Sequence, residues 1–209
     1  MKVLVFGASG STGRRLVDAA VGRRHSVTAF VRNPAAFQNG QGIEVFRGDV
    51  ADRHAVARAM PGQAAVLCVL GAATPLRRDP TLVAGVRHIT EAMVDAGVRR
   101  LVYLSFLGVP AGRHQLSALG RIVVAPVLLR KVAADHAEKE EIIQRSGLDW
   151  TIVRPPRLTN GPRTGTYRHG EAIHASQIVL RISRADIVDF MLRQLDDLTY
   201  LHRAPAVMP

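Results

Sequence analysis

The sequence predicts an α/β fold, built as one domain around a doubly wound, mainly parallel sheet. Short apolar runs alternate with helical patterns from the first residue onward, which is typical of stacked βαβ units. A glycine-rich turn at residues 7–13 joins the first apolar run to the first helical pattern. The 209 residues, 47% of them hydrophobic, suffice for one sizeable core and are too few for two ordinary enzyme domains. We therefore expect a single domain over residues 1–209.

Six short apolar segments are predicted to be strands. Each is rich in Val, Leu and Ile, as expected of parallel strands that are covered on both faces. They are Lys2–Phe6, Ser26–Val31, Ile43–Phe46, Ala64–Leu70, Leu101–Leu104 and Trp150–Val153. Two residues in them, Cys68 and Trp150, are expected in the core.

Five segments are predicted to be helices, and glycines close three of them. Ser183 is a plausible N-cap for the last helix, because Asp186 follows three residues later in a near relative of the capping box. The helices are Thr12–Gly22, Arg53–Met60, Pro80–Gly97, Val132–Ser146 and Ser183–Leu195.

Two segments follow no simple pattern. Residues 113–130 are apolar and basic but are interrupted by Gly120 and Pro126, so their structure is left open. Residues 155–170 hold three prolines, three glycines and no apolar period, which predicts a long loop of the kind that carries function. We expect substrate or lid elements at 105–130 and 155–170.

The net charge of +11 invites comparison with nucleic-acid-binding proteins. Arginines are scattered along the whole chain, however, and no basic stretch is interleaved with aromatic residues. We interpret the charge as a solvated surface, with anionic substrates or weak polyanion binding as alternatives, and expect no specific nucleic-acid partner and no metal site. No apolar run approaches the roughly 18 residues of a membrane span. A single cysteine indicates a reducing compartment, so a cytoplasmic protein is expected. Few exposed apolar stripes are evident in the sequence, so a monomer is expected, with a dimer as the alternative.

The glycine-rich turn predicts an anion site. A strand must turn sharply into a helix there, and the helix N-terminus then presents free N–H groups and its positive dipole end. Glycine removes the Cβ atoms that would block close approach, and hydroxyl groups add donors. These positions are Gly7, Gly10 and Gly13, with Ser9, Ser11 and Thr12. Such a turn predicts a Rossmann-type site for the pyrophosphate of a nicotinamide dinucleotide.

The G-x-x-G-x-x-G spacing resembles that of the short-chain dehydrogenase/reductase superfamily, in its extended and atypical branches. The resemblance continues through residues 47–50, Arg-Gly-Asp-Val, and residues 70–73, Leu-Gly-Ala-Ala. It implies that Asp49 and Val50 contact the adenine. It also implies that Leu70, Gly71 and Ala72 form the turn behind the adenine ribose.

The end of the second strand favours NADP(H) over NAD(H). NAD enzymes hold a carboxylate there for the ribose 2′-hydroxyl, and a carboxylate beside a 2′-phosphate is unfavourable. Residues 30–34 contain no acid, and Arg32 offers a planar fork suited to phosphate. Arg14 is a weaker candidate for helping Arg32 to bind this phosphate. The alternative is that Arg32 is an ordinary surface arginine.

The superfamily's usual catalytic pair, a tyrosine with a lysine four residues later, is missing. The fourth residues after Tyr103, Tyr167 and Tyr200 are Leu, Glu and Ala. In atypical members the lysine lies ten residues before the serine of a Ser-Gly-Leu-Asp pattern, and here that position holds His136. Reduction of a simple ketone by a tyrosine acid is therefore unsupported.

The C-terminal half resembles the biliverdin reductase B/flavin reductase family. The matching motifs are Asp135-His136, Ser146-Gly147-Leu148, Pro155-Pro156 and residues 164–167, Thr-Gly-Thr-Tyr. The resemblance implies direct hydride transfer from a nicotinamide to a conjugated acceptor whose proton comes from solvent.

Three residues are candidates for catalysis. Ser105 matches the family serine near the nicotinamide and substrate, a neighbourhood that also includes Pro155, although Ser105 could simply end a strand. His136 could orient a substrate or relay a proton. Its alternative is a structural role in the first helical turn, with Asp135 as a capping residue. Arg157 replaces the histidine of mammalian flavin reductases and would favour an anionic acceptor, unless it only faces solvent.

The leading hypothesis is an NADPH-dependent reductase of a flavin, quinone or similar acceptor. The rival is a non-catalytic, NmrA-like redox sensor that binds NADP(H). A sugar-nucleotide epimerase is disfavoured, because it needs the missing tyrosine and lysine. An open cleft flanked by Ser105, Pro155 and Arg157 would favour the reductase, and a site closed by residues 113–130 would favour the sensor.

Overall fold

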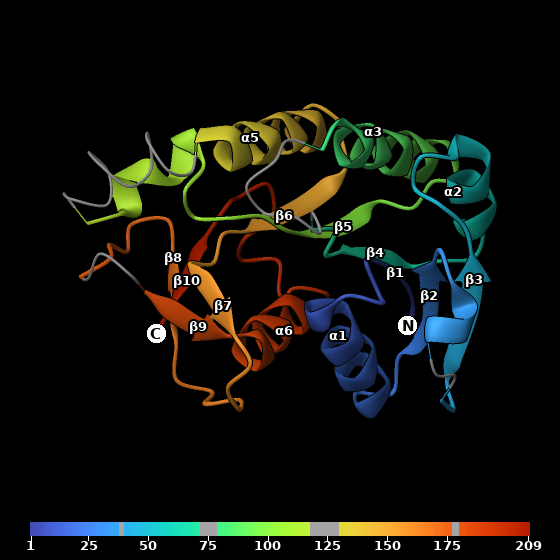
Figure 1. The fold of residues 1–209 in the computed structure, drawn as a ribbon, viewed down its shortest axis with the longest axis horizontal. Coiled ribbons are helices and arrows are strands. Elements are labelled where there is room, and N and C mark those ends of the chain that lie inside the picture. Colours follow the sequence, from blue (N-terminus) through green and yellow to red (C-terminus); the bar gives the residue numbers. More distant parts are fainter. Residues whose placement is uncertain (38–39, 72–78, 118–129, 177–179) are drawn as a thin grey trace.

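The central sheet has six parallel strands in the order β3-β2-β1-β4-β5-β6 (Figure 1). A computed structural model describes the chain apart from residues 38–39, 72–78, 118–129 and 177–179. The six predicted parallel strands are confirmed, with small shifts at their ends. Their bounds are Lys2–Phe6 (β1), Ser26–Val31 (β2), Ile43–Arg47 (β3), Ala65–Cys68 (β4), Arg100–Leu104 (β5) and Asp149–Val153 (β6).

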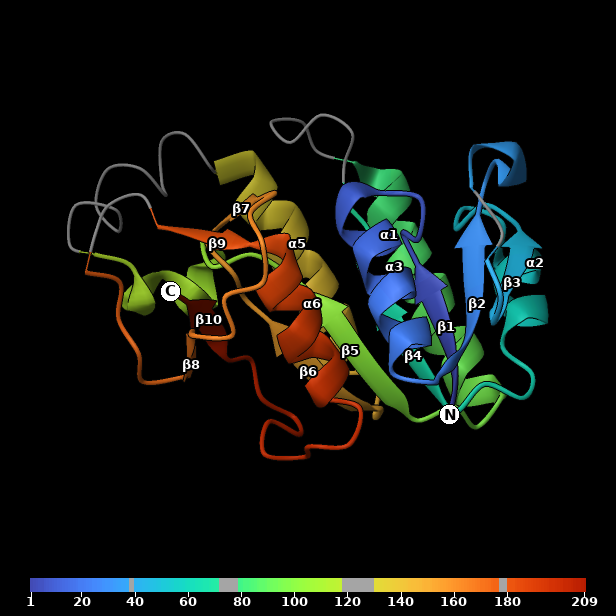
Figure 2. The same ribbon diagram turned by 90° about the horizontal axis from the view of Figure 1, so that it is seen from below.

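Helices cover both faces of the sheet, as a doubly wound fold requires. Helices α1 and α6 lie on one face, and α2, α3 and α5 lie on the other (Figures 1 and 2). Their bounds are Ser11–Gly22 (α1), Arg53–Ala59 (α2), Pro80–Asp95 (α3), Arg130–Gln144 (α5) and Arg184–Arg193 (α6). The fold is thus a Rossmann-like single domain, as predicted.

Alternation along the strands divides the core into two layers. In β1, Val3 and Val5 belong to the cluster under α1 and α6. Leu4 and Phe6 belong to the cluster under α2, α3 and α5. Because successive side chains of a strand point to opposite faces, one apolar run serves both layers. Cys68 and Trp150 are buried, as expected.

Side-chain caps fix where several helices begin. The Asp52 carboxylate accepts hydrogen bonds from the amides of His54 and Ala55 at the start of α2. The Ser183 hydroxyl accepts from the Asp186 amide at 2.9 Å, which confirms the predicted cap of α6. Each cap satisfies amides that the first helical turn leaves unpaired.

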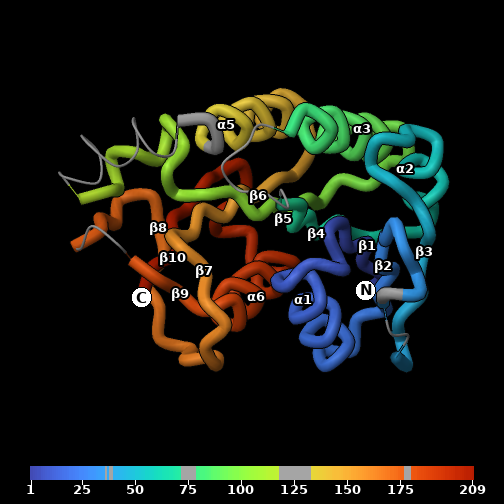
Figure 3. Tube along the Cα trace, viewed as in Figure 1, coloured from blue at the N-terminus to red at the C-terminus, as the bar shows by residue number. Residues whose placement is uncertain are grey.

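A small lobe follows the sixth strand, and here the prediction was wrong. The expected loop at 155–170 contains two short strands, β7 (Arg157–Thr159) and β8 (Arg168–Gly170). They pair with β9 (Arg181–Ser183) and β10 (Ala206–Met208), respectively. Three-residue strands show no apolar period, and their partners lie far along the chain, so no local signal marks them. In Figure 3 this lobe lies on the side of the molecule away from β1–β3.

Two short 3-10 helices complete the described elements, η1 (Pro34–Ala36) and η2 (Pro110–Gln115). Helix η2 overlaps the start of residues 113–130, the segment whose structure the sequence left open. The rest of that segment lies largely outside the described residues. Within the described part of the chain, no helix is long and apolar enough to cross a bilayer.

Candidate functional site

The glycine turn between β1 and α1 is closely packed backbone. Gly7 has a φ of +82°, and a Cβ there would lie 2.7 Å from the carbonyl oxygen of Val69. A Cβ on Gly13 would lie 2.0 Å from the carbonyl oxygen of Gly7. The N-cap of α1, Gly10, makes no side-chain capping bond. The helix therefore presents its positive end without a protein side chain to satisfy it, which is the arrangement that binds anions.

A cavity of about 630 Å³ opens over this turn, and we call it the glycine-turn pocket. Its wall contains most of the residues predicted to bind a cofactor, gathered from the ends of β1, β2, β3 and β4. Those residues are Gly7, Ser9, Gly10, Ser11, Thr12, Arg32, Asp49, Val50, Leu70 and Gly71. The carboxyl ends of neighbouring parallel strands meet at one edge of the sheet, which is why distant motifs converge there.

Three of the predicted cofactor residues that the structure describes are not on this wall. Gly13 is buried beneath the turn and allows its close packing. Ser105 and Pro155 are buried at the ends of β5 and β6. Ala72 lies outside the described residues.

Sequence reasoning missed several residues of the pocket. Phe30 and Val31 end β2, and Val69, predicted as strand, already leaves β4. Asp79, Thr81 and Leu82 come from the start of α3, and Arg184 comes from α6. The Asp-Pro pair at the start of α3 was a usable signal, since helix starts face this edge of the sheet. No local pattern marks Arg184.

Aromatic rings pack beside the end of β2. The rings of Phe30 and Phe46 stack with centroids 5.6 Å apart. A Cβ on Gly48 would lie 2.4 Å from the Phe30 ring, so the glycine leaves room for that ring. Asp49 follows directly, and its Oδ1 accepts a hydrogen bond from the Ala51 amide at 3.0 Å. This local turn fixes the carboxylate at the pocket wall.

The two arginines predicted to assist have different surroundings. Arg32 is exposed on the wall of the pocket, where it can reach an anionic ligand. Arg14 donates from Nε to the carbonyl oxygen of Ser9 at 3.0 Å, and its guanidinium lies 5.7 Å from the Phe37 ring centroid. Arg14 therefore supports the shape of the turn.

Ser105 belongs to a buried ionic network. Its hydroxyl donates to Oε1 of Glu140 at 2.5 Å. Arg154 donates to both oxygens of Glu140, at 3.1 Å from Nε and 2.5 Å from Nη2. The Arg154 and Glu140 side chains are 6% and 4% exposed. The network joins the ends of β5 and β6 to α5, and of its three residues only Ser105 was predicted as a site residue.

His136 lies on α5 beside Phe106, with ring centroids 6.1 Å apart. Burial, and then the charge of Lys139, lowers its pKa to about 4. The imidazole is neutral at pH 7, so the predicted relay through an imidazolium is not favoured. Its Nδ1 is buried and has no hydrogen-bond partner among the described residues.

The alternative structural reading of Asp135 and His136 needs correction. Helix α5 begins at Arg130, so neither residue lies in its first turn. Asp135 is buried, and its carboxylate accepts a hydrogen bond from the backbone amide of Asp79 at 2.7 Å. It therefore holds the start of α3 beside the glycine-turn pocket.

Lys139 was not singled out from the sequence, because it lies seven residues before Ser146 rather than ten. It is 3% exposed, on the same helix one turn after Asp135. Burial lowers the pKa of its ammonium, and Asp135 partly opposes that effect. Burial also raises the pKa of the nearby Cys68 thiol to about 12, so the thiol is protonated and unreactive.

The three tyrosines lie elsewhere, and the Tyr103 hydroxyl has no hydrogen-bond partner among the described residues. Tyr103 is fully buried in β5, and burial raises its pKa well above the usual value. The Tyr167 hydroxyl donates to Asp189 at 2.8 Å. The Tyr200 hydroxyl lies 2.7 Å from Nδ1 of His169. None of the three lines the glycine-turn pocket.

Arg157 is exposed at the start of β7. The structure thus brings Ser105 and Pro155 into the buried end of the sheet and leaves Arg157 in solvent. Residues 113–130, which would close the site of a redox sensor, lie mostly outside the described residues. The choice between an open and a closed site therefore needs an experiment.

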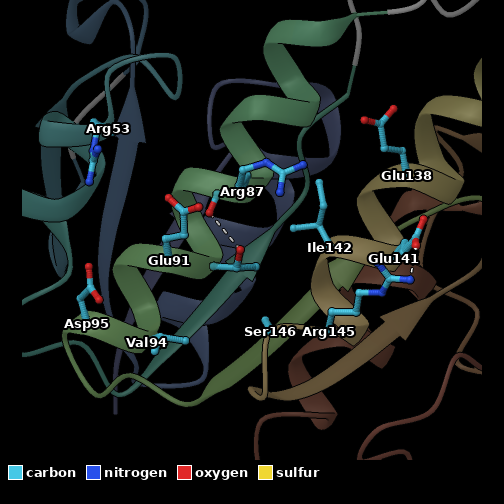
Figure 4. Close-up of a pocket in the computed structure, with 11 residues that line it drawn as sticks. Arg53, Arg87, Glu91, Val94, Asp95, Glu138, Glu141, Ile142, Arg145 and Ser146 are labelled. Atoms are coloured by element: carbon cyan, nitrogen blue, oxygen red, sulfur yellow. Dashed lines mark hydrogen bonds and ion pairs between the residues drawn. The ribbon is translucent and has the colours of Figure 1, made fainter.

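A larger cavity, of about 680 Å³, lies between α3 and α5 on the outer face of the molecule (Figure 4). Its charged walls mix arginines with carboxylates, and Arg145 pairs with Glu141 at 2.8 Å. Its lining shares no residue with the glycine-turn pocket. Its lining includes Arg53 at the start of α2 but no glycine turn, so the glycine-turn pocket is the better candidate for a ligand site.

One family model and several known proteins are similar to the chain. A family model described as NAD(P)H-binding matches residues 7–198. The chain is 29% identical to an uncharacterized sugar epimerase, YhfK, of Bacillus subtilis (strain 168), over 98% of this chain and 92% of that one. It is 33% identical to a 3-diazoavenalumate denitrifying reductase of a Streptomyces species over 81% of this chain, and it spans 60% of that reductase. The solved structure of ChuY, an anaerobillin reductase from Escherichia coli O157:H7, has a TM-score of 0.80 at 23% identity, covering 100% of this chain and 97% of that one.

Proposed function

The chain belongs to the NAD(P)H-binding family, and from that premise we propose that it is an NADPH-dependent reductase acting on a flavin, quinone or similar conjugated acceptor. The dinucleotide would occupy the glycine-turn pocket, with its pyrophosphate at the N-terminus of α1. The packed backbone at Gly7 and Gly13 fits this ligand, since Cβ atoms there would destroy the turn. When bound, NADPH supplies a hydride, and the acceptor takes that hydride together with one proton from solvent.

The observation that carries the proposal is the kind of residue at the pocket. The wall supplies an anion site and hydroxyl groups, and none of its described residues is a tyrosine or a lysine. A ketone needs a proton donor at its oxygen when hydride arrives. A conjugated acceptor spreads the added charge over its ring system, so a strong protein acid is unnecessary. This favours a flavin or quinone over a simple ketone or a sugar.

NADPH is proposed over NADH because of the charge at the end of β2. Arg32 is exposed on the pocket wall and can donate two parallel hydrogen bonds to a 2′-phosphate. Residues 30–34 contain no carboxylate that would repel it.

The three predicted catalytic residues receive separate proposed roles. Ser105 is a positioning residue, because its hydroxyl hydrogen is donated to Glu140. His136, neutral at pH 7, can offer one ring N–H to the acceptor. Arg157, exposed on β7, would bind a carboxylate or phosphate on the acceptor.

Two reductases among the compared proteins support this class of reaction. The Streptomyces reductase shares a third of its aligned residues with the chain, and the anaerobillin reductase shares the fold. The uncharacterized sugar epimerase is 29% identical to the chain over 98% of its length. An epimerase is still disfavoured, because none of the three tyrosines is among the described residues that line the pocket.

The test is oxidation of NADPH in the presence of FMN, riboflavin or a small quinone, followed by loss of the dihydronicotinamide absorbance. We expect turnover with at least one acceptor. Arg157→Gln should raise the KM for FMN more than the KM for riboflavin, and Ser105→Ala should lower kcat. Arg58→Gln, an exposed site on α2, is the matched control. Tight NADPH binding with no turnover on any acceptor would contradict the reductase and leave the redox sensor.

A further inference from the structure

One side chain of the glycine-turn pocket comes from outside the N-terminal half of the chain. Arg184 is the first residue of α6, and it lines the pocket together with residues from β1 to α3. Helix α6 packs beside α1, so its start lies near the start of α1 (Figures 1 and 2). A cation is thereby added to a wall that already carries the positive end of a helix.

The Arg184 guanidinium is held in place but retains hydrogen-bonding capacity. Its Nη1 donates to Oδ1 of Asn160 at 2.8 Å. Its Nε is buried and has no hydrogen-bond partner in the part of the chain that the structure describes. A buried donor without a partner is costly, and a guanidinium offers five N–H groups in one plane. Asn160 accepts one of these five, and the guanidinium can donate others to an anion in the pocket that it lines.

The positions of the two positive groups indicate which anion. The α1 N-terminus and Arg184 belong to one wall of one cavity, which also includes Ser9, Gly10 and Ser11. The two carboxylates of the pocket, Asp49 and Asp79, accept hydrogen bonds from amides of their own turns, and a negative ligand would add attraction to both positive groups. The pyrophosphate of a dinucleotide is the anion that a glycine turn of this kind binds, and it carries oxygens enough for both partners.

We propose that Arg184 binds the cofactor's pyrophosphate from the C-terminal lobe, and that Asn160 positions its guanidinium. The inference rests on the proposed cofactor site and deepens it. It makes the cofactor a bridge between the two halves of the chain, because Asn160 lies in the segment that follows β7. A phosphate on the acceptor is the other source of the same chemistry, and the experiment separates the two.

The experiment measures binding by fluorescence or calorimetry, without turnover. The ligands are NADPH, 2′-phospho-ADP-ribose and adenosine 2′-monophosphate, of which the last lacks a pyrophosphate. Arg184→Gln should weaken the first two by roughly 10- to 100-fold, the range expected for loss of a charged hydrogen bond. Adenosine 2′-monophosphate should bind equally well to both proteins. Arg181→Gln, exposed on β9 three residues away, is the matched control and should change no affinity.

Asn160→Ala tests the positioning role. It should weaken NADPH binding by several-fold in the wild-type background and have no further effect in the Arg184→Gln background, because both changes act through one guanidinium. Arg184→Lys keeps the charge but loses the planar fork. Its affinity for NADPH should therefore lie between those of the wild type and Arg184→Gln. Circular dichroism and thermal midpoints show that each variant is folded.

Two results would overturn the inference. One is an Arg184→Gln protein with unchanged affinity for both pyrophosphate ligands. The other is an effect confined to the KM for FMN, which would assign the arginine to the acceptor's phosphate. Because binding is measured directly, a protein that binds NADPH but reduces nothing would defeat the proposed reductase and still test this inference.

Discussion

The half of the molecule that ends with α3 and the half that begins with β5 build their polar contacts differently. Around the glycine turn the contacts are mainly backbone, such as the Gly10 amide to the Gly7 carbonyl at 3.0 Å and the Arg14 amide to the Gly10 carbonyl at 2.9 Å. In the second half, buried carboxylates bind arginines, hydroxyls and amides from distant segments. The first half therefore depends on space around its backbone, and the second depends on charge.

Two carboxylates of α6 illustrate the second half. Burial alone would raise the pKa of Asp186, but hydrogen bonds from Gly165, Ser183 and Thr164 leave that pKa below its usual value. Asp189 likewise has a lowered pKa, despite its burial, because Tyr167 and Arg163 donate to it. It also binds Arg23, which directly follows α1. These carboxylates hold the segment after β7 and join it to the N-terminal half.

The largest effect should come from the buried network in the second half. Glu140→Gln leaves Arg154 buried without its countercharge, and we expect a loss of about 3 kcal/mol or more in unfolding free energy. Urea denaturation measures it. The exposed neighbour Glu141→Gln should cost below about 1 kcal/mol. Arg154→Met added to Glu140→Gln should recover part of the loss, and a double variant less stable than the single one would contradict this account.

A space-dependent first half can be tested at Gly13. Its alanine variant places a methyl group 2.0 Å from a backbone carbonyl oxygen. We expect about 3 kcal/mol of destabilisation and a loss of NADPH binding of roughly 100-fold, since the turn must deform. At Gly22 a methyl group meets no atom within 4 Å, so Gly22→Ala is the control. Equal affinities for the two variants would show that the turn is not closely packed.

Protonation should affect the second half through His136. Its folded pKa of about 4 lies below the ordinary 6.5. The unfolded chain therefore takes up the proton first, and the stability present above pH 6.5 is lost as the pH falls toward 4. Between pH 7 and pH 5 this amounts to about 2 kcal/mol.

The measurement is chemical denaturation of the wild type and of His136→Gln at both pH values. The variant should lack this share of the acid destabilisation, whereas His54→Gln, at an exposed site on α2, should retain it. Parallel pH dependences for all three proteins would show that His136 is not desolvated.

The smallest effect is expected at Arg32, on the pocket wall in the first half. Arg32→Gln should weaken NADPH binding by about tenfold, because one charged hydrogen-bonding partner of the 2′-phosphate is lost. NADH binding should not change, and Arg58→Gln should alter neither affinity. An equal loss for NADH would place the arginine elsewhere on the dinucleotide.

The sequence by itself determined the sheet, the helices and the cofactor turn. The apolar runs from Lys2 to Val153 are local patterns, and they placed all six strands in the right class and order along the chain. The glycine spacing marked the pocket because a turn from strand to helix is a local backbone event. The predicted membership of an NAD(P)H-binding family is likewise confirmed.

Only the tertiary structure decided the partners of the candidate site residues. Ser105 donates to Glu140, 35 positions away, and Asp135 holds the amide of Asp79, 56 positions away. Arg184 lines a pocket whose other described residues all precede position 83. Such pairings depend on how α5 and α6 pack on the sheet. Periodicity fixes which face of an element is buried, but it does not fix which distant side chain that face meets, because the meeting point follows from the packing of whole elements.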